Sequence, residues 1–313
     1  MGKKKTLDPS DDSGSTKTIS TTTSGFADKA YKNGIPEQAY SKLPTNFDDI
    51  RKRHAARRAT ISPPESVYEG YVNRVEGAGN EATVVIETSG KLLKEYDDRG
   101  YNRAFNRSFT NAPPNAGYND GLSAPQPDFI EGLEKQEFRP FQVANIPGAA
   151  LYRDDPRSIT LPHIAGEWKG PTGDIREARI QSAYDGAALV YSRNQALSYI
   201  GKSDPPGHAE ITTFTTDGKN ISFFAHYAAE SEDGTLEYHQ FPIKSTSLVN
   251  SYGEYKEGRR GLRNEQDHAK RQSQALRDQL KEHYKQQRSS GLHPIAEGAP
   301  SLPVPGTRPL DAC

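Results

Sequence analysis

The segment Ile159–Trp168 constrains the fold of this chain more than any other part of the sequence. It is a strongly apolar run that predicts a β-strand, and its last residues, Glu167 and Trp168, are followed by Lys169. Because successive side chains of a strand point to opposite faces, Glu167 and Lys169 share one face while Trp168 points into the other layer. An ordinary ion pair on an edge strand is the alternative, but an acid and a lysine ending so apolar a strand favour a functional site.

A long helix is predicted directly after this strand. Following the turn Gly170-Pro171-Thr172-Gly173, an amphipathic pattern begins near Asp174 and ends before Gly201. Gln181 flanks the buried stripe of this helix. Tyr184 lies on the stripe, so a purely structural place in the core is the alternative to a functional role. The stripe consists of Ile180, Ala183, Tyr184, Ala187, Ala188 and Tyr191.

Three further strands are predicted at 209–215, 220–227 and 236–243. The turn signals Asp217-Gly218 and Asp233-Gly234 separate them. A strand, a helix and then more strands predict an α/β fold in which helices flank a central mixed β-sheet.

Upstream of the long strand, two acidic residues are candidate partners of Glu167. Asp128 follows Pro127 at the expected entrance of a strand, with a turn-forming aspartate as the alternative. Helices are predicted at 66–75 and 80–96, and in the second of these Glu81 lies on the apolar stripe with Val85, Thr88 and Leu92. A carboxylate on that stripe favours a paired or metal-binding role, whereas an Asn80 N-cap would explain Glu81 by its place in the first helical turn. Residues 104–127 read as a loop, and 138–143 as one extra strand.

The flanks differ from this centre in composition. The chain has 313 residues, of which only 33% are hydrophobic. Residues 1–62 are rich in Ser, Thr and Lys and are predicted to be a disordered tail; 63–288 form the folded domain, and the Pro-rich 289–313 form a second disordered tail. Within the first tail, residues 51–58 hold five basic side chains and a histidine, which suits a nuclear-import signal, a phosphate contact or simply a solvated helix.

The last predicted helix, 252–288, has an excess of Lys and Arg and few leucines. This composition suits contact with phosphates, with a solvated charged helix as the alternative. The chain as a whole carries a formal net charge of −1, so only such local clusters bear on a nucleic-acid partner.

Composition also excludes some classes of protein. The only cysteine, Cys313, rules out intramolecular disulfides and multi-thiolate zinc sites, and suits a reducing compartment. The eight histidines show no metal-ligand spacing. With no apolar run of about 18 residues and no apolar core of a signal peptide, we expect an intracellular protein of the nucleus or cytoplasm that does not enter a membrane.

Asp128 after proline, the strand Glu167-Trp168-Lys169 and the helix with Gln181 and Tyr184 follow the motif order of the PD-(D/E)xK nuclease superfamily, which the chain therefore resembles. Gln181 and Tyr184 look like the Gln-x-x-Tyr signature of its RecB-like branch. Residues from about 66 to 285 are also similar to an uncharacterised domain found mainly in fungal proteins. The resemblance implies a restriction-endonuclease-like core.

The resemblance also implies a chemistry for each residue. Asp128 and Glu167 would bind Mg²⁺ or Mn²⁺, with the backbone carbonyl of Trp168 as a further ligand and Glu81 as a further acid. Lys169 would act on the attacking water, and Gln181 with Tyr184 would orient the site or the DNA backbone.

Two functional classes follow from this pattern. The first is a metal-dependent nuclease acting on nucleic acid, with DNA expected rather than RNA, and with a homodimer possible. The second is a catalytically inactive module that keeps the nuclease fold and binds nucleic acid or a protein. The distance between the Asp128 and Glu167 carboxyls separates the two classes.

Overall fold

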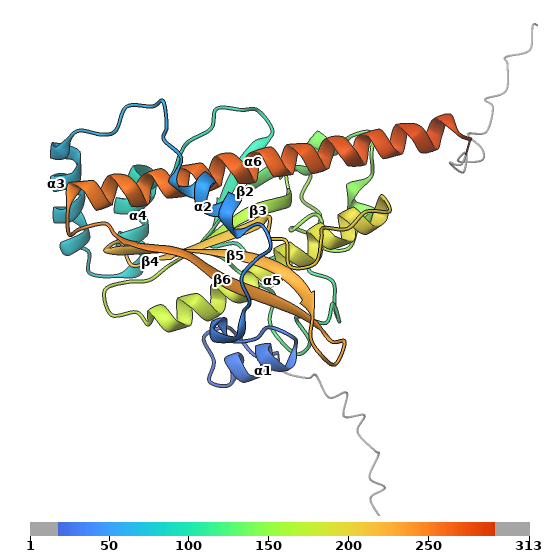
Figure 1. Ribbon diagram of the computed structural model, residues 1–313, viewed down its shortest axis with the longest axis horizontal. Coiled ribbons are helices and arrows are strands. Elements are labelled where there is room, and N and C mark those ends of the chain that lie inside the picture. Colours follow the sequence, from blue (N-terminus) through green and yellow to red (C-terminus); the bar gives the residue numbers. More distant parts are fainter. Residues whose placement is uncertain (1–17, 292–313) are drawn as a thin grey trace, which may run out of the picture.

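The computed structural model describes residues 18–291. Its centre is a six-stranded sheet whose strands lie in the order in which they occur in the chain, and only β3 and β4 pair in parallel (Figure 1). The strands are β1 (Tyr101–Phe105), β2 (Phe129–Glu134), β3 (Ile159–Trp168), β4 (Ile211–Thr216), β5 (Asn220–Glu230) and β6 (Leu236–Ser247). The predicted α/β class with a mixed sheet flanked by helices is therefore confirmed.

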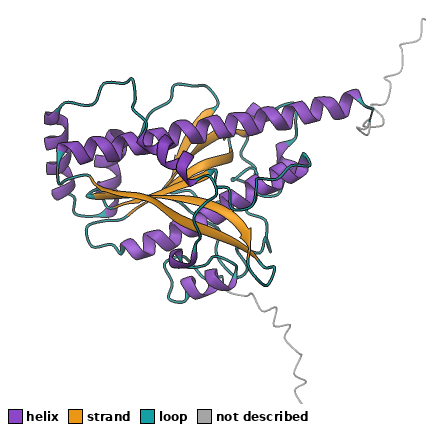
Figure 2. Cartoon of the chain, in the orientation of Figure 1, coloured by secondary structure: helices purple, strands orange, loops and turns teal. Residues whose placement is uncertain are grey.

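Helices cover both faces of this sheet (Figure 2). The central helix α5 packs on β3 and β4 from one side, and the long helix α6 crosses the other side. The helices are α1 (Phe26–Lys32), α2 (Phe47–Ala55), α3 (Glu65–Glu76), α4 (Glu81–Leu92), α5 (Ile175–Tyr199) and α6 (Tyr252–Ser289), with short 3-10 turns at Gln38–Tyr40, Lys135–Phe138 and Val143–Asn145.

The parallel pairing of β3 with β4 results from the helix between them. Asp174 caps the start of α5, where its side chain accepts a hydrogen bond from the amide of Arg176. Strands that pair in parallel need a connection long enough to return the chain to the same edge, and a helix of 25 residues provides it. All ten residues of β3 are buried, since helices cover both of its faces.

Side chains alternate along the end of β3 as predicted. Trp168 lies on the α6 side, where its ring packs edge-on against Phe214 and its indole nitrogen donates to Thr88 of α4 (3.0 Å). Glu167 lies on the α5 side. The strand therefore supplies an aromatic anchor to one layer and its acid to the other.

Two regions differ from the predicted elements. The extra strand expected at 138–143 is wrong, because 3-10 turns and an irregular chain occupy that region. The helix expected over 80–96 ends at Leu92, and the chain after it forms β1, which pairs antiparallel with β2. β1 has only five residues, and Asn102 and Arg103 interrupt its apolar pattern, so the sequence alone gave no strong strand signal there.

The expectation of a disordered tail over residues 1–62 is wrong for residues 18–62. Phe26 of α1 is buried and packs edge-on against Tyr184, and Ile50 of α2 is fully buried. These helices are short, so tertiary contacts stabilise them more than their own periodicity does. Residues 1–17, and 292–313 of the second expected tail, lie outside the described residues.

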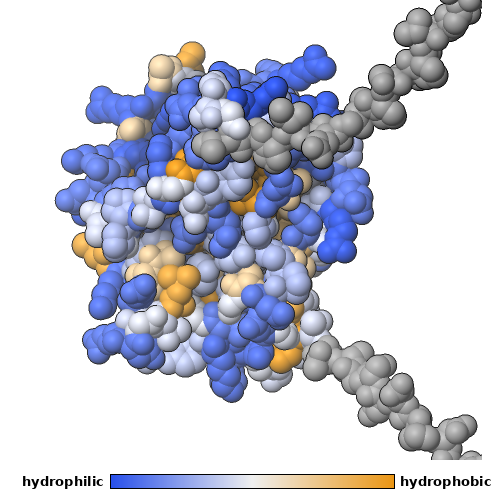
Figure 3. Space-filling model, turned by 90° about the vertical axis from the view of Figure 1, so that its right-hand side faces the viewer, coloured by the Kyte–Doolittle hydropathy of each residue, from blue (hydrophilic) through white to orange (hydrophobic). Residues whose placement is uncertain are grey.

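The surface of the described part is mostly hydrophilic on the face shown in Figure 3, with apolar residues in small separate patches. Among residues 18–291, no helix is both long enough and apolar enough to cross a membrane.

Close packing at Gly166 of β3 gives a testable consequence. A Cβ at this position would lie 2.2 Å from the ring of Phe214, which is buried against Trp168. We therefore expect Gly166→Ala to lower the free energy of unfolding by about 1–3 kcal/mol, measured by urea denaturation. The matched control is Gly90→Ala in α4, where a Cβ meets no atom within 4 Å. That change should be neutral or stabilising by about 0.5–1 kcal/mol, and equal effects of the two variants would contradict this packing.

Candidate active site

The pairing of β2 with β3 brings the first two predicted acids together. Phe129 of β2 pairs with Gly166 of β3, so the preceding residue, Asp128, lies beside Glu167 on the same face. The two carboxyls are in hydrogen-bonding contact. Asp128 also accepts a hydrogen bond from the backbone amide of Trp168 through its Oδ2 (2.7 Å). Asp128 therefore lies at the strand entrance, half-buried, and contacts the other acid directly.

A third acid, Asp185 of α5, completes this group and was missed by the sequence reasoning. It is buried, faces the sheet, and its carboxyl is in hydrogen-bonding contact with that of Glu167. Its Oδ2 is buried and has no hydrogen-bond partner among the described residues. The available signal was an aspartate directly beside Tyr184, within an otherwise small and apolar stretch of the helix.

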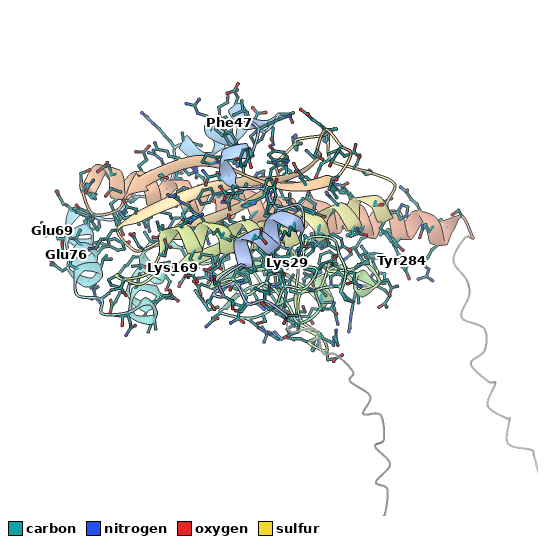
Figure 4. The ribbon with its side chains drawn as sticks, turned by 90° about the horizontal axis from the view of Figure 1, so that it is seen from below. Lys29, Phe47, Glu69, Glu76, Lys169 and Tyr284 are labelled. Carbon is teal, nitrogen blue, oxygen red and sulfur yellow. The ribbon has the colours of Figure 1, made fainter. Side chains whose placement is uncertain are left out.

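Lys169 continues from β3 into the same site. Its amide donates to the carbonyl of Thr216, which extends the parallel ladder by one residue, and only 10% of its side chain is exposed. Lys169 Nζ lies 3.9 Å from Oε2 of Glu81, at the start of α4. Figure 4 places Lys169 toward the end of the molecule that carries α3.

Glu81 lies where the helix-start explanation places it, and the predicted apolar stripe with Val85 is wrong because Val84 is the buried residue. Asn80 caps α4 by accepting a hydrogen bond from the amide of Thr83, so Glu81 does occupy the first helical turn. Its half-exposed carboxylate also points to Lys169. Gly170 makes this approach possible, because a Cβ there would lie 2.8 Å from the amide nitrogen of Glu81. The buried stripe of α4 runs through Val84, Thr88 and Leu92.

The electrostatics of the site are those of crowded acids. Burial, followed by the neighbouring Asp185 and Asp128 carboxyls, raises the pKa of Glu167 well above its ordinary value. Burial also raises the pKa of Asp185 and of Asp128, and Glu81 adds to the rise at Asp128. Lys169 opposes the rise at all three acids. A single ammonium therefore faces more negative charge than it can balance, and protons or a cation must supply the rest.

The two helix residues of the predicted signature lie beside this group. Gln181 is buried one turn before Asp185, and its side-chain nitrogen is 3.3 Å from both Thr21 Oγ1 and Glu177 Oε1. Tyr184 is fully buried in the core, and its hydroxyl donates to the carbonyl of Ser123 (2.7 Å). Tyr184 therefore holds the chain leading to Asp128, and its hydroxyl is engaged there rather than with an acid of the cluster.

The donor set suits a hard divalent cation. Mg²⁺ and Mn²⁺ prefer carboxylate oxygens, and Mg²⁺ takes only one or two of them while keeping several waters. Asp128 and Glu167 supply such a pair, and the unpartnered Oδ2 of Asp185 adds an oxygen nearby. Within residues 18–291, however, no three Asp, Glu, His or Cys side chains are arranged as a complete metal cage. The acids instead contact each other, as in a protonated cluster.

Comparison with known proteins assigns a family but no activity. The family described as "Domain of unknown function (DUF7924)" matches residues 80–272, more than half of the chain, and the chain therefore belongs to this family. The matched range begins at the cap of α4 and includes Glu81, Asp128, Glu167, Lys169 and Asp185. No curated protein and no solved structure matches the chain.

The raised pKa values of the buried acids predict how stability depends on pH. Burial raises the pKa of Asp185 to about 7. The folded protein therefore holds protons that the unfolded chain has released, and this contribution to stability is present at low pH and is lost as the pH rises through about 7. We expect Asp185→Asn, which cannot ionise, to be more stable than the wild type at about pH 8, by about 1–3 kcal/mol.

Urea denaturation across about pH 5 to 8 measures this effect. Glu131, on the other face of the sheet, has its pKa raised by burial to about 8 and contributes a slope of the same sign, so the test is the difference between variant and wild type. Asp233→Asn, at an exposed turn position, is the matched control and should keep the wild-type slope. If the unfolding free energy of Asp185→Asn depends on pH as that of the wild type does, the raised pKa of Asp185 is refuted.

Proposed function

We propose that this protein is a metal-dependent nuclease that hydrolyses phosphodiester bonds of nucleic acid. The observation that carries the proposal is the meeting of Asp128, Glu167 and Lys169 at the end of β3, from positions far apart in the sequence. Two carboxyls and one ammonium in a mostly buried site are the groups that such a hydrolysis requires.

Each residue has a defined task in this proposal. Asp128 and Glu167 hold Mg²⁺ or Mn²⁺, which when bound would neutralise phosphate charge and lower the pKa of a water. Lys169 donates a hydrogen bond to the attacking water or to a phosphate oxygen, which stabilises negative charge in the transition state. Its low exposure makes that charge effective, because little water screens it. Glu81, at 3.9 Å, orients the ammonium.

The neighbouring residues position this set. Asp185 contacts Glu167 and receives the proton that Glu167 must lose to bind a cation. Gln181 lies one turn away on α5 and is proposed to orient the nucleic-acid backbone. Tyr184 is a positioning residue, because its hydrogen bond to Ser123 fixes the chain that enters β2 at Asp128. The carbonyl of Trp168 remains a proposed further ligand.

The motif order supports the same proposal. The chain resembles the PD-(D/E)xK superfamily in the sequence of an acid at a strand entrance, a Glu-x-Lys strand and a helix with Gln. The antiparallel pair β2–β3, the crossover α5 and the parallel strand β4 suit the restriction-endonuclease-like core that this resemblance implies. DNA as the preferred substrate, a nuclear or cytoplasmic location and a homodimer belong to the proposal as well.

One observation favours the second candidate, an inactive module with a nuclease fold. The described residues contain no complete metal cage, and the acids are close enough to share protons. Such a module would bind nucleic acid or a protein through the same surface without a cation.

A cleavage assay decides between the two. We expect purified protein to cleave plasmid DNA with Mg²⁺ or Mn²⁺ and to stop when EDTA is added. Lys169→Ala should lower the rate by about 10²–10³ or more, because it removes the ammonium that acts on all three acids. Its thermal melting temperature should stay within a few degrees of the wild type. Lys202→Ala, an exposed lysine, is the matched control and should cleave normally. Wild-type cleavage by Lys169→Ala would refute the assignment, and no cleavage by the wild type would favour the inactive module.

A further inference from the structure

Two basic segments that are about 200 residues apart in sequence line one groove. The groove has a volume of about 590 Å³ and lies between the α2–α3 connection and the start of α6. Arg57 and Arg58 line it from the connection, and Lys256, Arg259 and Arg260 line it from the helix. The only acid in its lining is Glu257.

Most of these cations are not neutralised within the protein. Among residues 18–291, no salt bridge involves Arg57, Lys256 or Arg260. Glu257, the acid of the groove, is itself paired with Lys244. The Nε atoms of Arg58 and Arg260 are buried without a hydrogen-bond partner in the described part of the chain. The groove therefore presents positive charge and free donors.

Further along α6 the basic residues are mixed. Lys270 pairs with Asp98, Arg277 with Asp278 and Lys285 with Glu282, whereas Arg271, Lys281 and Arg288 have no salt bridge among residues 18–291. At the groove Arg58 pairs with Asp267, whereas Arg57, Lys256 and Arg260 have no salt bridge among the described residues, and the guanidinium groups there repel each other. Burial, and then the charges of Arg259 and Arg58, lower the pKa of Arg263 behind the groove to about 10. An anion in the groove would relieve this repulsion, and the nearby N-terminus of α6 adds to the attraction.

A second basic hollow continues the groove. It shares Arg260 and Glu257 with the first and adds three cations, Arg51, Lys52 and Lys244, and one acid, Asp48. Lys52 pairs with Asp49 and Lys244 with Glu257, so Arg51 and Arg260 are the cations of this hollow that have no salt bridge among the described residues. Two adjoining hollows with unpaired cations in each suit a polymer with regularly spaced phosphates better than one small anion.

We infer that this basic groove binds the phosphodiester backbone of duplex nucleic acid. The choice of nucleic acid among polyanions rests on the proposed function, but the groove lies on the α6 side of the molecule, and none of its residues belongs to the acid cluster. It is a holding surface separate from the chemistry.

Binding of a fluorescein-labelled DNA duplex, followed by fluorescence anisotropy in EDTA over a series of salt concentrations, tests the inference without any cleavage. The test variant is Arg57→Ala/Lys256→Ala/Arg260→Ala, which spares Arg259 because its Nε donates to the carbonyl of Lys91. The matched control, Arg277→Ala/Lys285→Ala/Arg288→Ala, removes the same charge from the far part of α6. Thermal melts confirm that both variants are folded.

We expect the test variant to bind about tenfold or more weakly, with the slope of log K against log salt reduced by about 2–3, since each phosphate contact contributes about 0.9. The control should keep the wild-type slope. Equal losses in both variants, or no loss in the test variant, would overturn the inference. Complete competition by millimolar inorganic phosphate would also overturn it, because a single-anion site would then explain the groove.

The cleavage assay on the wild type separates this inference from the proposed function, because the binding measurement in EDTA involves no cleavage. If the wild type fails to cleave but the groove variant still loses binding, the nuclease proposal fails, and the inference that the groove binds nucleic acid is supported.

Discussion

Burial of the Glu167 carboxyl between β3 and α5 is the constraint around which this end of the molecule is arranged. A buried carboxylate is unfavourable unless an opposite charge, a proton or a cation compensates it. Here Lys169 supplies opposite charge on one side, and on the other the Asp185 and Asp128 carboxyls raise the pKa of Glu167 and so favour its protonated form. Gly170 allows α4 to approach this group, and Gly173 packs against the stem of Lys169. A core built for stability alone would place apolar side chains at these positions.

The sequence predicted the middle of the fold well, because the signals there are local. β3, α5 and the three following strands all have a clear period or a clear turn, and they occur close to where they were expected. The proximity of Asp128 to Glu167, by contrast, could not be predicted from a local pattern. It depends on the pairing of β2 with β3 across a connection of irregular structure, and no local pattern in that connection specifies the register.

Two further features, the role of Asp185 and the folding of the basic stretch around α2, depend on tertiary contacts and so could not be predicted from local sequence patterns. Asp185 reads as an ordinary helical aspartate until the sheet against which it packs is known. In the basic stretch around α2, Arg53 pairs with Glu265 and Arg58 with Asp267, whereas Arg57 has no salt bridge among the described residues. The sequence shows five similar charges there, and only the tertiary structure separates those that hold α6 from those that face outward. The same contacts explain why the region is folded rather than a tail.

Helix α4 connects the two charged regions of this protein. Its first turn rests on Gly170 beside the acids, and the carbonyls at its other end accept hydrogen bonds from Arg259 and Arg263 of α6 (2.7–3.0 Å). A helix of 12 residues is about 18 Å long, close to the rise of five base pairs of a DNA duplex at about 3.4 Å each. One short helix therefore joins the basic groove to the acid cluster. If both proposals hold, the length of α4, rather than any base contact, would set the distance between the point where a duplex is held and the point where its backbone meets the acids.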